Sequence, residues 1–582
     1  MSSRYSDHTK LRTNAALTKE AEAEVRRAMG RTLKKLGAVE MEIAGLQDRL
    51  VVLGQRKRDT KSFIEAHQRL LSPIRQLLPE ILQEIFWQCL PVAHNSVLSA
   101  KEAPLVLGRV CSQWRRIAYS TPKLWCSLHI AIPPLTYSRA QAIFEAYEAW
   151  IARSGILPLS ISISDAKQLE VSKDQFRSYF ELITLHTRRW RSIYLQVPFS
   201  DKLDFLAEID GDRFPLLEGF HVDRGYFGNL TMVDHLLSRK DGILSAPLLR
   251  VLSISRISLG TLDLPVQWSL LTGLNLSYAN LQECFELLTL CLNLEMCTLY
   301  DVGRSHHSFS NSQSSNKSRP NIVLSKLQTL EIVGELRQDD TSWILLDNLA
   351  TPALRCFVYR TFEGQDLSPT DLLLSIKVFR LFFQRLNQPL EELQLNVSSS
   401  MTTFSTELLS LVPSLKRLSL LYPSTFYGSP CGDCMLLGFI PSEHKSHHHS
   451  CSSDAQQIDD HEPNSPSSST CLCPNLKVLN IDNVSISKHV LLEYLRSRLV
   501  DYEKYNVARL RRFNVSFILK PEDETMTAEE IAEIDGLCKE AGLLVKFEPS
   551  DHLTAPKEPP PSSFGEYFPS WSSTDTWNMC FD

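Results

Sequence analysis

The residues with the richest potential chemistry in this 582-residue chain are cysteines and histidines gathered in and beside one polar stretch, Pro423 to Thr470. They are Cys431, Cys434, His444, His447, His448, His449, Cys451, His461, Cys471 and Cys473. Four soft ligands from such a set can hold Zn²⁺ in a tetrahedral site. The Cys471-x-Cys473 spacing is unusual for zinc, however, and the serine-rich surroundings are typical of a long surface loop. We therefore expect no metal and no cofactor, with zinc as the alternative.

The sequence contains none of the motifs that position catalytic groups. It has no glycine-rich phosphate loop, no Gly-x-Ser-x-Gly elbow, no His-Glu-x-x-His helix and no kinase signature. The acidic pairs Asp339-Asp340 and Asp459-Asp460 lie in loop-like sequence, where carboxylates are solvated rather than tuned to different pKa values as an acid and a base. We therefore expect no catalytic residues, and not an enzyme.

The composition is that of a globular protein, with 43% hydrophobic and 22% charged residues. A formal net charge of -6 argues against nucleic acid as the main partner, because binding to phosphates usually needs a basic excess. Neither a secretory signal nor a membrane-spanning stretch is visible, so we expect a cytoplasmic or nuclear protein that does not enter membranes. Fourteen cysteines are scattered along the chain, which indicates reduced thiols rather than a disulfide framework.

A long helix is predicted over residues 18–70, after a polar and disordered segment 1–17. It begins at Thr18, with Glu20, Glu22 and Glu24 in its first turns. Its apolar residues alternate in steps of three and four, at Leu36, Val39, Ile43, Leu46, Leu50 and Leu53. This spacing is typical of a coiled-coil seam, which makes self-association through residues 18–70 one interpretation. The other is a helix that folds back on the next segment or merely spaces it from solvent.

The stretch from Leu71 to Leu128 contains two helical apolar patterns and a shorter apolar run between them. The first pattern consists of Leu77, Ile81, Leu82, Ile85, Phe86 and Cys89, with Pro79 in its first turn. The run Pro104 to Leu107 then leads into a third helix, in which Val110, Trp114, Ile117 and Ala118 recur. Three such short helices bury little apolar surface by themselves, so we expect a partner or a following domain to cover them.

This order of residues resembles the F-box, in the F-box-like form found in large families of fungal proteins. The matching motifs are L-x-P-E-I-L-x-E-I-F, P-L, V-C-x-x-W-R-x-I-A and P-x-L-W, within residues 71–128. The resemblance implies a Skp-family adaptor as partner and, through it, a cullin. The residues it assigns to the adaptor are Leu77, Pro79, Ile81, Leu82, Ile85, Phe86, Pro104, Leu105, Val110, Cys111 and Trp114.

One departure from the F-box pattern motivates a second reading. Most members have Leu-Pro where this chain has Leu77-Leu78, and proline comes only at Pro79. The alternative is therefore an interaction scaffold outside any ligase, with a degenerate F-box.

Beyond the F-box the chain repeats a unit L-x-x-L-x-L eleven times, with other apolar residues allowed. The units start at Trp190, Leu217, Leu249, Leu271, Leu294, Leu327, Leu354, Leu390, Leu415, Leu476 and Leu510. They resemble irregular leucine-rich repeats, in which each unit gives one short parallel strand and a helix or loop that returns the chain. A doubly wound sheet is the competing architecture, but it predicts longer continuous apolar strands and no recurring proline before the unit.

The expected fold class is thus α/β: an N-terminal coiled-coil helix, a three-helix F-box and a leucine-rich-repeat-like solenoid of parallel strands. The solenoid is expected over residues 129–548, with disordered insertions at about 305–321 and 423–470 and a disordered tail at 549–582. Together the two resemblances imply the substrate-recognition subunit of an SCF-type ubiquitin ligase. The F-box would bind the adaptor, and the repeats would bind a protein substrate that the sequence does not identify.

Overall fold

A computed structural model describes most of the chain. The residues described are 18–132, 140–164, 173–196, 206, 209–223, 239–255, 263–277, 279, 281–302, 321–334, 342–360, 369–396, 407–421, 433–441, 471–519, 528–541 and 544–549. The disorder expected for residues 1–17, 305–321 and 549–582 concerns residues that lie almost entirely outside these ranges.

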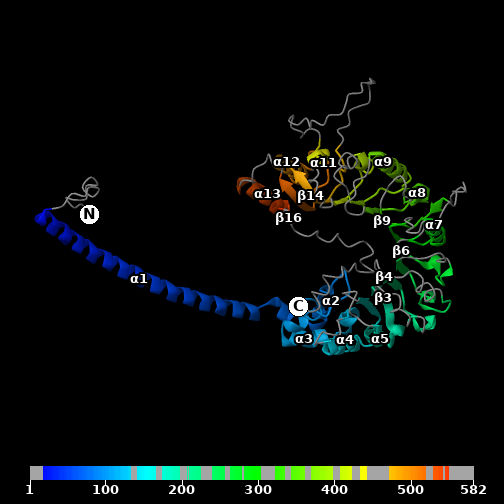
Figure 1. Ribbon diagram of the computed structural model, residues 1–582, viewed down its shortest axis with the longest axis horizontal. Coiled ribbons are helices and arrows are strands. Elements are labelled where there is room, and N and C mark those ends of the chain that lie inside the picture. The colour runs from blue at the N-terminus through cyan, green and yellow to red at the C-terminus, as the bar shows by residue number, and fades with distance from the viewer. Residues whose placement is uncertain are drawn as a thin grey trace, which may run out of the picture. The chain divides into compact units, whose positions relative to one another are not determined.

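The chain divides into two compact units, residues 1–84 and 85–582. The main element of the first is α1 (Lys19–Leu70), a helix of 52 residues (Figure 1). The side chain of Thr18 caps it by accepting a hydrogen bond from the backbone N–H of Ala21 at 3.4 Å, and Glu20 and Glu22 complement the positive end of its dipole. The long N-terminal helix expected from the sequence is therefore confirmed.

Short helical elements occupy the stretch 71–128. They are the 3₁₀ turn η1 (Pro73–Gln76), α2 (Pro79–Gln88), the 3₁₀ turn η2 (Leu107–Arg109), α3 (Ser112–Tyr119) and the 3₁₀ turn η3 (Pro122–Trp125). Two of the three expected helices are thus α-helices, and the middle one is the single turn η2. Pro104 lacks an N–H and Gly108 is a poor helix former, so the run between them is too short to propagate an α-helix.

The rest of the chain builds one parallel sheet of fourteen described strands, in the order of the sequence. The strands are β1 (Ser127–Ala131), β2 (Leu159–Ser164), β3 (Trp190–Gln196), β4 (Gly219–Asp223), β5 (Val251–Ser255), β6 (Gly273–Ser277), β7 (Met296–Tyr300), β9 (Thr329–Val333), β11 (Cys356–Arg360), β12 (Glu392–Asn396), β13 (Arg417–Leu421), β14 (Val478–Ile486), β15 (Arg512–Leu519) and β16 (Leu544–Pro549). β8 (Ile322–Val323) and β10 (Leu349–Ala350) form a separate parallel pair. The order never reverses, which excludes the doubly wound alternative. The expected α/β class with a parallel sheet is confirmed.

Helices return the chain between several strands. The described ones are α4 (Ala140–Arg153), α5 (Lys173–Thr184), α7 (Leu281–Leu290), α8 (Ser342–Asn348), α9 (Pro369–Gln384), α11 (Asp433–Phe439), α12 (Lys488–Leu499) and α13 (Ala528–Ala541). Figure 1 shows α4, α5, α7, α8 and α9 along one side of the row of strands.

The apolar residues of the eleven sequence units form a continuous core. The fourth and sixth residues of every unit lie in a strand, and the first, fourth and sixth residues are all at most 3% exposed. The alternating apolar side chains of one strand form only a thin strip of core, so the side chains of the neighbouring strands must complete it. The prediction of one parallel strand per unit is confirmed.

A ladder of backbone hydrogen bonds joins the units at the residue that follows the first position. The backbone N–H of Glu218 donates to the carbonyl of Arg191. Nine further bonds of 2.7–2.9 Å repeat this step, and the last runs from the N–H of Arg511 to the carbonyl of Lys477. The step from Lys416 to Lys477 crosses the Pro423–Thr470 insertion and measures 2.8 Å. The insertion therefore does not interrupt the sheet.

The insertion is not entirely the disordered loop that its composition indicates. α11 lies within it, and Met435, Leu436, Phe439 and Ile440 are buried. The ring of Phe439 packs at 6.4 Å from that of Tyr494 on α12. The apolar run 435–440 is long enough to fold against α12, a signal that the flanking polar residues conceal. Residues 423–432 and 442–470 lie outside the described ranges.

Candidate functional site

Aromatic packing holds the second half of α2 against α3. Phe86 is fully buried, and its ring centroid lies 4.7 Å from that of Trp114. After α3, the indole N–H of the buried Trp125 donates to the carbonyl of Ala118 at 2.9 Å. That bond satisfies one of the carbonyls that the end of a helix leaves without an intrahelical partner.

The same tryptophan connects this segment to the first helix beyond it. Trp125 packs edge-on against Trp150 of α4 with ring centroids 4.8 Å apart. The guanidinium of Arg153, also on α4, lies 4.8 Å from the ring centroid of Trp125 and 4.9 Å from that of Tyr119. Cation–π contacts of this kind add to the apolar packing. The helical segment from α3 onward is therefore firmly attached to the sheet-forming part of the chain.

The structure sorts the eleven adaptor-binding candidates by exposure. Leu82, Phe86 and Pro104 are buried; Leu77, Leu105 and Trp114 are half-buried; Pro79, Ile81, Ile85, Val110 and Cys111 are exposed. Buried side chains cannot contact a partner in this conformation, so the first three serve the core. Only the exposed and half-buried residues are available for binding.

Three exposed apolar residues of this segment lie at the start of α2 and along one side of it. Leu78, Ile81 and Ile85 follow one another at intervals of three and four residues, and they are 66%, 50% and 36% exposed. Such spacing puts them on the same side of a helix. Val110, just before α3, is 58% exposed. Contiguous exposed apolar residues are a mark of protein interaction sites.

A buried histidine ties the loop after α2 to the first strands. The backbone N–H of His129 on β1 donates to the carbonyl of Ser96 at 2.8 Å. The ring nitrogens of His129 lie 2.9 Å from Ser162 Oγ and 3.2 Å from Ser164 Oγ, both on β2. Burial, and secondarily the nearby His94, lowers the pKa of His129 to about 3. The imidazole is thus neutral at physiological pH and links β1 to β2, whereas the backbone N–H of His129 connects β1 to the loop after α2.

The face of the sheet opposite the leucine core carries one in-register row of residues. In each unit this is the fifth residue; on strands outside the eleven units it is the residue in register with it. Side chains alternate between the two faces of a strand, so the fifth residue lies opposite the buried fourth and sixth. The row is His129, Ser162, Tyr194, His221, Ser253, Asn275, Thr298, Glu331, Val358, Gln394, Ser419, Asn480, Asn514 and Lys546. Val358 is its only aliphatic member. None of these residues was singled out from the sequence, although their place in the unit is the signal that finds them.

The first part of this polar row contains an aromatic patch. The rings of Tyr194 and His221 stack with centroids 4.0 Å apart and planes 8° from parallel. Tyr194 also packs with Val251, and the partly buried Met296 lies against this cluster. Burial lowers the pKa of His221 to about 3, so the stacked imidazole is neutral near pH 7.

A buried carboxylate occupies the middle of the polar row. Glu331 is 2% exposed; it accepts a hydrogen bond from the hydroxyl of Thr298 at 3.3 Å and lies 3.5 Å from the guanidinium of Arg360. Burial raises the pKa of Glu331, and Arg360 and Thr298 oppose that rise. A buried charge of this kind is tolerated because it is paired and hydrogen-bonded.

Two amides and a hydroxyl form a chain of hydrogen bonds at the far part of the row. Asn514 Nδ2 donates to Asn480 Oδ1 at 2.8 Å, and Asn480 Nδ2 donates to Ser419 Oγ at 2.9 Å. All three are half-buried. Amide side chains offer both donors and acceptors, the chemistry that recognises the backbone or polar side chains of another polypeptide.

The described cysteines at the insertion bond to backbone rather than to one another. Cys471 Sγ donates to the carbonyl of Phe439 at 3.2 Å, and the buried Cys473 Sγ lies 3.8 Å from the carbonyl of Val412. The described residues contain no group of three or more His, Cys, Asp or Glu side chains arranged to hold a metal ion. Of the other candidates, Cys434 lies on α11, and the rest fall outside the described ranges.

A fully buried arginine closes the point where the insertion rejoins the repeats. Arg498 on α12 donates to the carbonyls of Pro474 (3.1 Å), Phe439 (3.0 Å), Leu472 (3.3 Å) and Cys473 (3.3 Å). The guanidinium has several donors in one plane, which is why one side chain can bind carbonyls from both sides of the insertion. Its role is structural.

The thiols near α7 have no nucleophilic character. Cys284 and Cys291 are fully buried, and burial raises the pKa of each to about 12. Only the thiolate is a good nucleophile, so these cysteines are inert at physiological pH.

Comparison with known proteins assigns no family. No family model matches the chain, and no curated protein is similar to it. Among the described helices, none combines the length and the apolar character that crossing a bilayer requires.

Proposed function

We propose that this chain is the substrate-recognition subunit of an SCF-type ubiquitin ligase. α2, η2 and α3 form the F-box and bind a Skp-family adaptor, which connects the chain to a cullin. The fourteen-stranded sheet with its helices is a leucine-rich-repeat solenoid, and the half-buried members of its polar row, Asn480 and Asn514 among them, contact the protein to be ubiquitinated. The protein works in the cytoplasm, the nucleus or both, and it makes and breaks no bonds itself.

The observation that carries the proposal is the division of α2 into two apolar faces. Leu82 and Phe86 are at most 1% exposed, whereas Ile81 and Ile85, each one residue earlier, remain at 50% and 36%. A helix that only supported a core would expose polar residues on its second face. Fully burying one isoleucine under a partner stabilises a complex by about 1.5–3 kcal/mol, so these residues can contribute substantially to adaptor binding.

The strand architecture supports the second half of the proposal. Every described strand of the large sheet pairs in parallel with its sequence neighbour, as stacked repeats do. On the face opposite the core, the polar row contains the half-buried His221, Asn275, Ser419, Asn480 and Asn514, whereas its other described members from His129 to Gln394 are buried. Such a surface can follow an extended stretch of another protein over many strands.

The mechanism of such a subunit is proximity. A substrate held on the repeats lies beside a ubiquitin-charged enzyme brought by the cullin, so the transfer becomes nearly intramolecular. Firm attachment of the F-box to the repeats matters for that geometry. The Trp125–Trp150 packing and the bond from the backbone N–H of His129 to the carbonyl of Ser96 supply it in this chain.

Co-purification with the Skp adaptor tests the proposal. Ile81→Asp and Ile85→Asp each place a charge on the exposed face of α2, and each is expected to lower adaptor retention about ten- to a hundredfold, the factor that corresponds to 1.5–3 kcal/mol. Val92→Asp is the matched control, because Val92 is 79% exposed in the same stretch and is not among the adaptor candidates. Leu82→Asp is unsuitable, since it would place a charge in the core.

The alternative is an interaction scaffold that does not engage the adaptor. Leu78, which stands where most F-boxes have proline, motivates it. Failure of the wild-type chain to retain the adaptor at micromolar concentration would reject the ligase and leave this scaffold. Retention that Ile81→Asp and Ile85→Asp abolish would reject the scaffold.

A further inference from the structure

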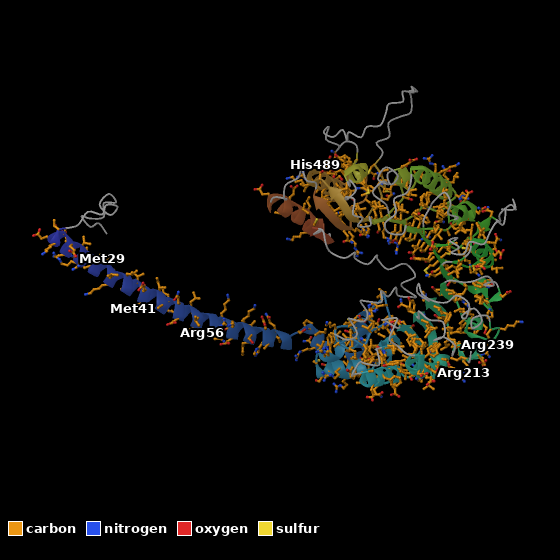
Figure 2. The ribbon with its side chains drawn as sticks, in the orientation of Figure 1. Met29, Met41, Arg56, Arg213, Arg239 and His489 are labelled. Atoms are coloured by element: carbon orange, nitrogen blue, oxygen red, sulfur yellow. The ribbon has the colours of Figure 1, made fainter. Side chains whose placement is uncertain are left out.

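α1 exposes a row of large apolar side chains along about a third of its length. Its a and d positions in heptad notation are all apolar from Leu36 to Leu53. The side chains concerned, with their exposed fractions, are Leu36 (52%), Val39 (50%), Ile43 (49%), Leu46 (60%), Leu50 (73%) and Leu53 (56%). We call these six residues the α1 seam. Figure 2 shows side chains projecting all round α1, among them those of Met29, Met41 and Arg56.

The strict 3.5-residue repeat of the α1 seam matches the geometry of a second helix. Six apolar residues in perfect alternation are buried together when another helix with the same repeat packs knobs into holes. The central heptad has Ile43 at a and Leu46 at d, the combination that favours two-stranded coils. The most direct source of such a helix is a second copy of α1.

The charges flanking the seam favour a parallel pair. In a parallel coil a g residue faces the e residue five positions later on the other helix. Lys35 occupies g and Glu40 occupies e, so each helix would offer one cation and one anion to the other. An antiparallel pair of the same seam would instead bring Lys35 close to Arg56 of the other copy, and this repulsion offsets the attraction that the same pair creates between Glu42 and Arg49. The parallel pair has the attraction without the repulsion.

The a and d residues on either side of the seam limit how far the pair extends. Toward the N-terminus, Thr32 is a polar residue at the d position next to the seam, and Met29 and Val25 beyond it are apolar residues at a and d. Toward the C-terminus, Lys57 takes the a position and would face Lys57 of the other copy. Like charges at the seam destabilise the coil, so the two helices separate from that point.

We infer that two copies of this protein associate as a parallel coiled coil along Val25–Leu53, separating from Lys57 onward. Each copy then carries its own F-box and its own repeats. A dimeric receptor would hold two substrate surfaces and two adaptors in one assembly. The inference concerns α1 alone and does not depend on the proposed ligase function.

Sedimentation equilibrium or light scattering of the full chain at micromolar concentration tests the inference. The expected mass is twice the 66.2 kDa of one chain. Ile43→Asp with Leu46→Asp should give the single-chain mass. Met41→Asp is the matched control: Met41 is 74% exposed on α1 but lies at an f position, away from the seam, and the substituted chain should stay dimeric. A single-chain mass for the wild type, or equal disruption by Met41→Asp, would overturn the inference.

Charge exchange and cross-linking separate pairing from loss of the helix. Lys35→Glu or Glu40→Lys alone should weaken the dimer several-fold, and the two together should restore it because the pairs are reversed. Leu36→Cys should form a disulfide-linked dimer on oxidation, since the two sulfurs meet in a parallel pair only. No restoration in the double variant, or no cross-link at residue 36, would contradict the parallel arrangement. Adaptor binding is not a readout of either experiment.

Discussion

The ring of Phe86 lies 4.7 Å from the ring of Trp114, and this contact fixes which side of α2 turns inward. The residue before it, Ile85, remains 36% exposed. One position along the helix thus separates a side chain that holds the fold from one that can bind a partner. A helix rotates by about 100° per residue, so neighbours of the same chemistry end on different faces.

Substitutions at these two neighbours should change stability by very different amounts. Phe86→Ala removes a fully buried ring and is expected to destabilise the segment by about 3–5 kcal/mol. Ile85→Asp should change stability by no more than about 0.5 kcal/mol, because its site is open to solvent. Hydrogen exchange of the α2 and α3 amides measures both changes. Equal protection in the two variants would mean that Phe86 is not the core residue of this segment.

The repeats were predictable from sequence because a single periodicity determines them. The first, fourth and sixth positions of all eleven units are buried. This periodicity can be recognised without knowing which elements contact one another in the fold. The division of α2 into a buried and an exposed apolar face was not predictable in this way. Ile81 and Leu82 have nearly the same hydrophobicity and size, and only the packing around α2 decides which one is buried.

Contacts between distant segments account for the other residues that sequence reasoning missed. His129 bonds to Ser162 and Ser164, which lie 33 and 35 residues away, and Arg498 binds the carbonyl of Phe439 from 59 residues away. β1 begins at Ser127, inside the stretch assigned to the F-box, because its apolar residues pair with β2 rather than with a helix. Local patterns carry no information about such partners.

Arg498 should be far more important for stability than its neighbour Arg496. Arg498→Met removes the guanidinium donor from four carbonyls. Those of Pro474 and Cys473 keep a backbone donor, whereas those of Phe439 and Leu472 keep only the weak thiol donor of Cys471. A hydrogen bond lost from a buried group costs about 1–3 kcal/mol, so a total of several kcal/mol is expected. Arg496 is 51% exposed and pairs with Glu533, and Arg496→Met should cost at most about 1 kcal/mol. Thermal denaturation and hydrogen exchange at residues 471–474 compare the two. Similar losses would contradict the carbonyl-binding role.

His129 should make the fold sensitive to acid in a defined window. In the unfolded chain its pKa is near 6.5, but in the folded protein it is about 3, because the buried imidazole cannot be solvated as a cation. Below pH 6.5 the unfolded state binds the proton and the folded state does not, so the free energy of unfolding falls as the pH drops toward 3. Its contribution is fully present above pH 6.5.

The expected slope from His129 is about 1.4 kcal/mol per pH unit, or about 2 kcal/mol between pH 6.5 and 5. Chemical denaturation at several pH values measures it. His129→Asn keeps polar groups at the site but does not titrate, so this variant should lose less stability over the same window. Identical pH profiles for the variant and the wild type would show that His129 is protonated in the folded protein.

Residues 442–470 should be removable without loss of the fold. The chain leaves and rejoins the repeats at one place, where the N–H of Leu472 donates to the carbonyl of Gly438 at 2.9 Å, so a linker of a few glycines and serines can span the gap.

Deletion of 433–470 is the informative control. It removes buried Leu436 and Phe439 together with Asp433, whose carboxylate accepts hydrogen bonds from the N–H and hydroxyl of Ser487. The shorter deletion should keep the melting temperature within a few degrees, whereas the longer one should lower it markedly. If the shorter deletion also unfolds the protein, residues 442–470 contribute to the core.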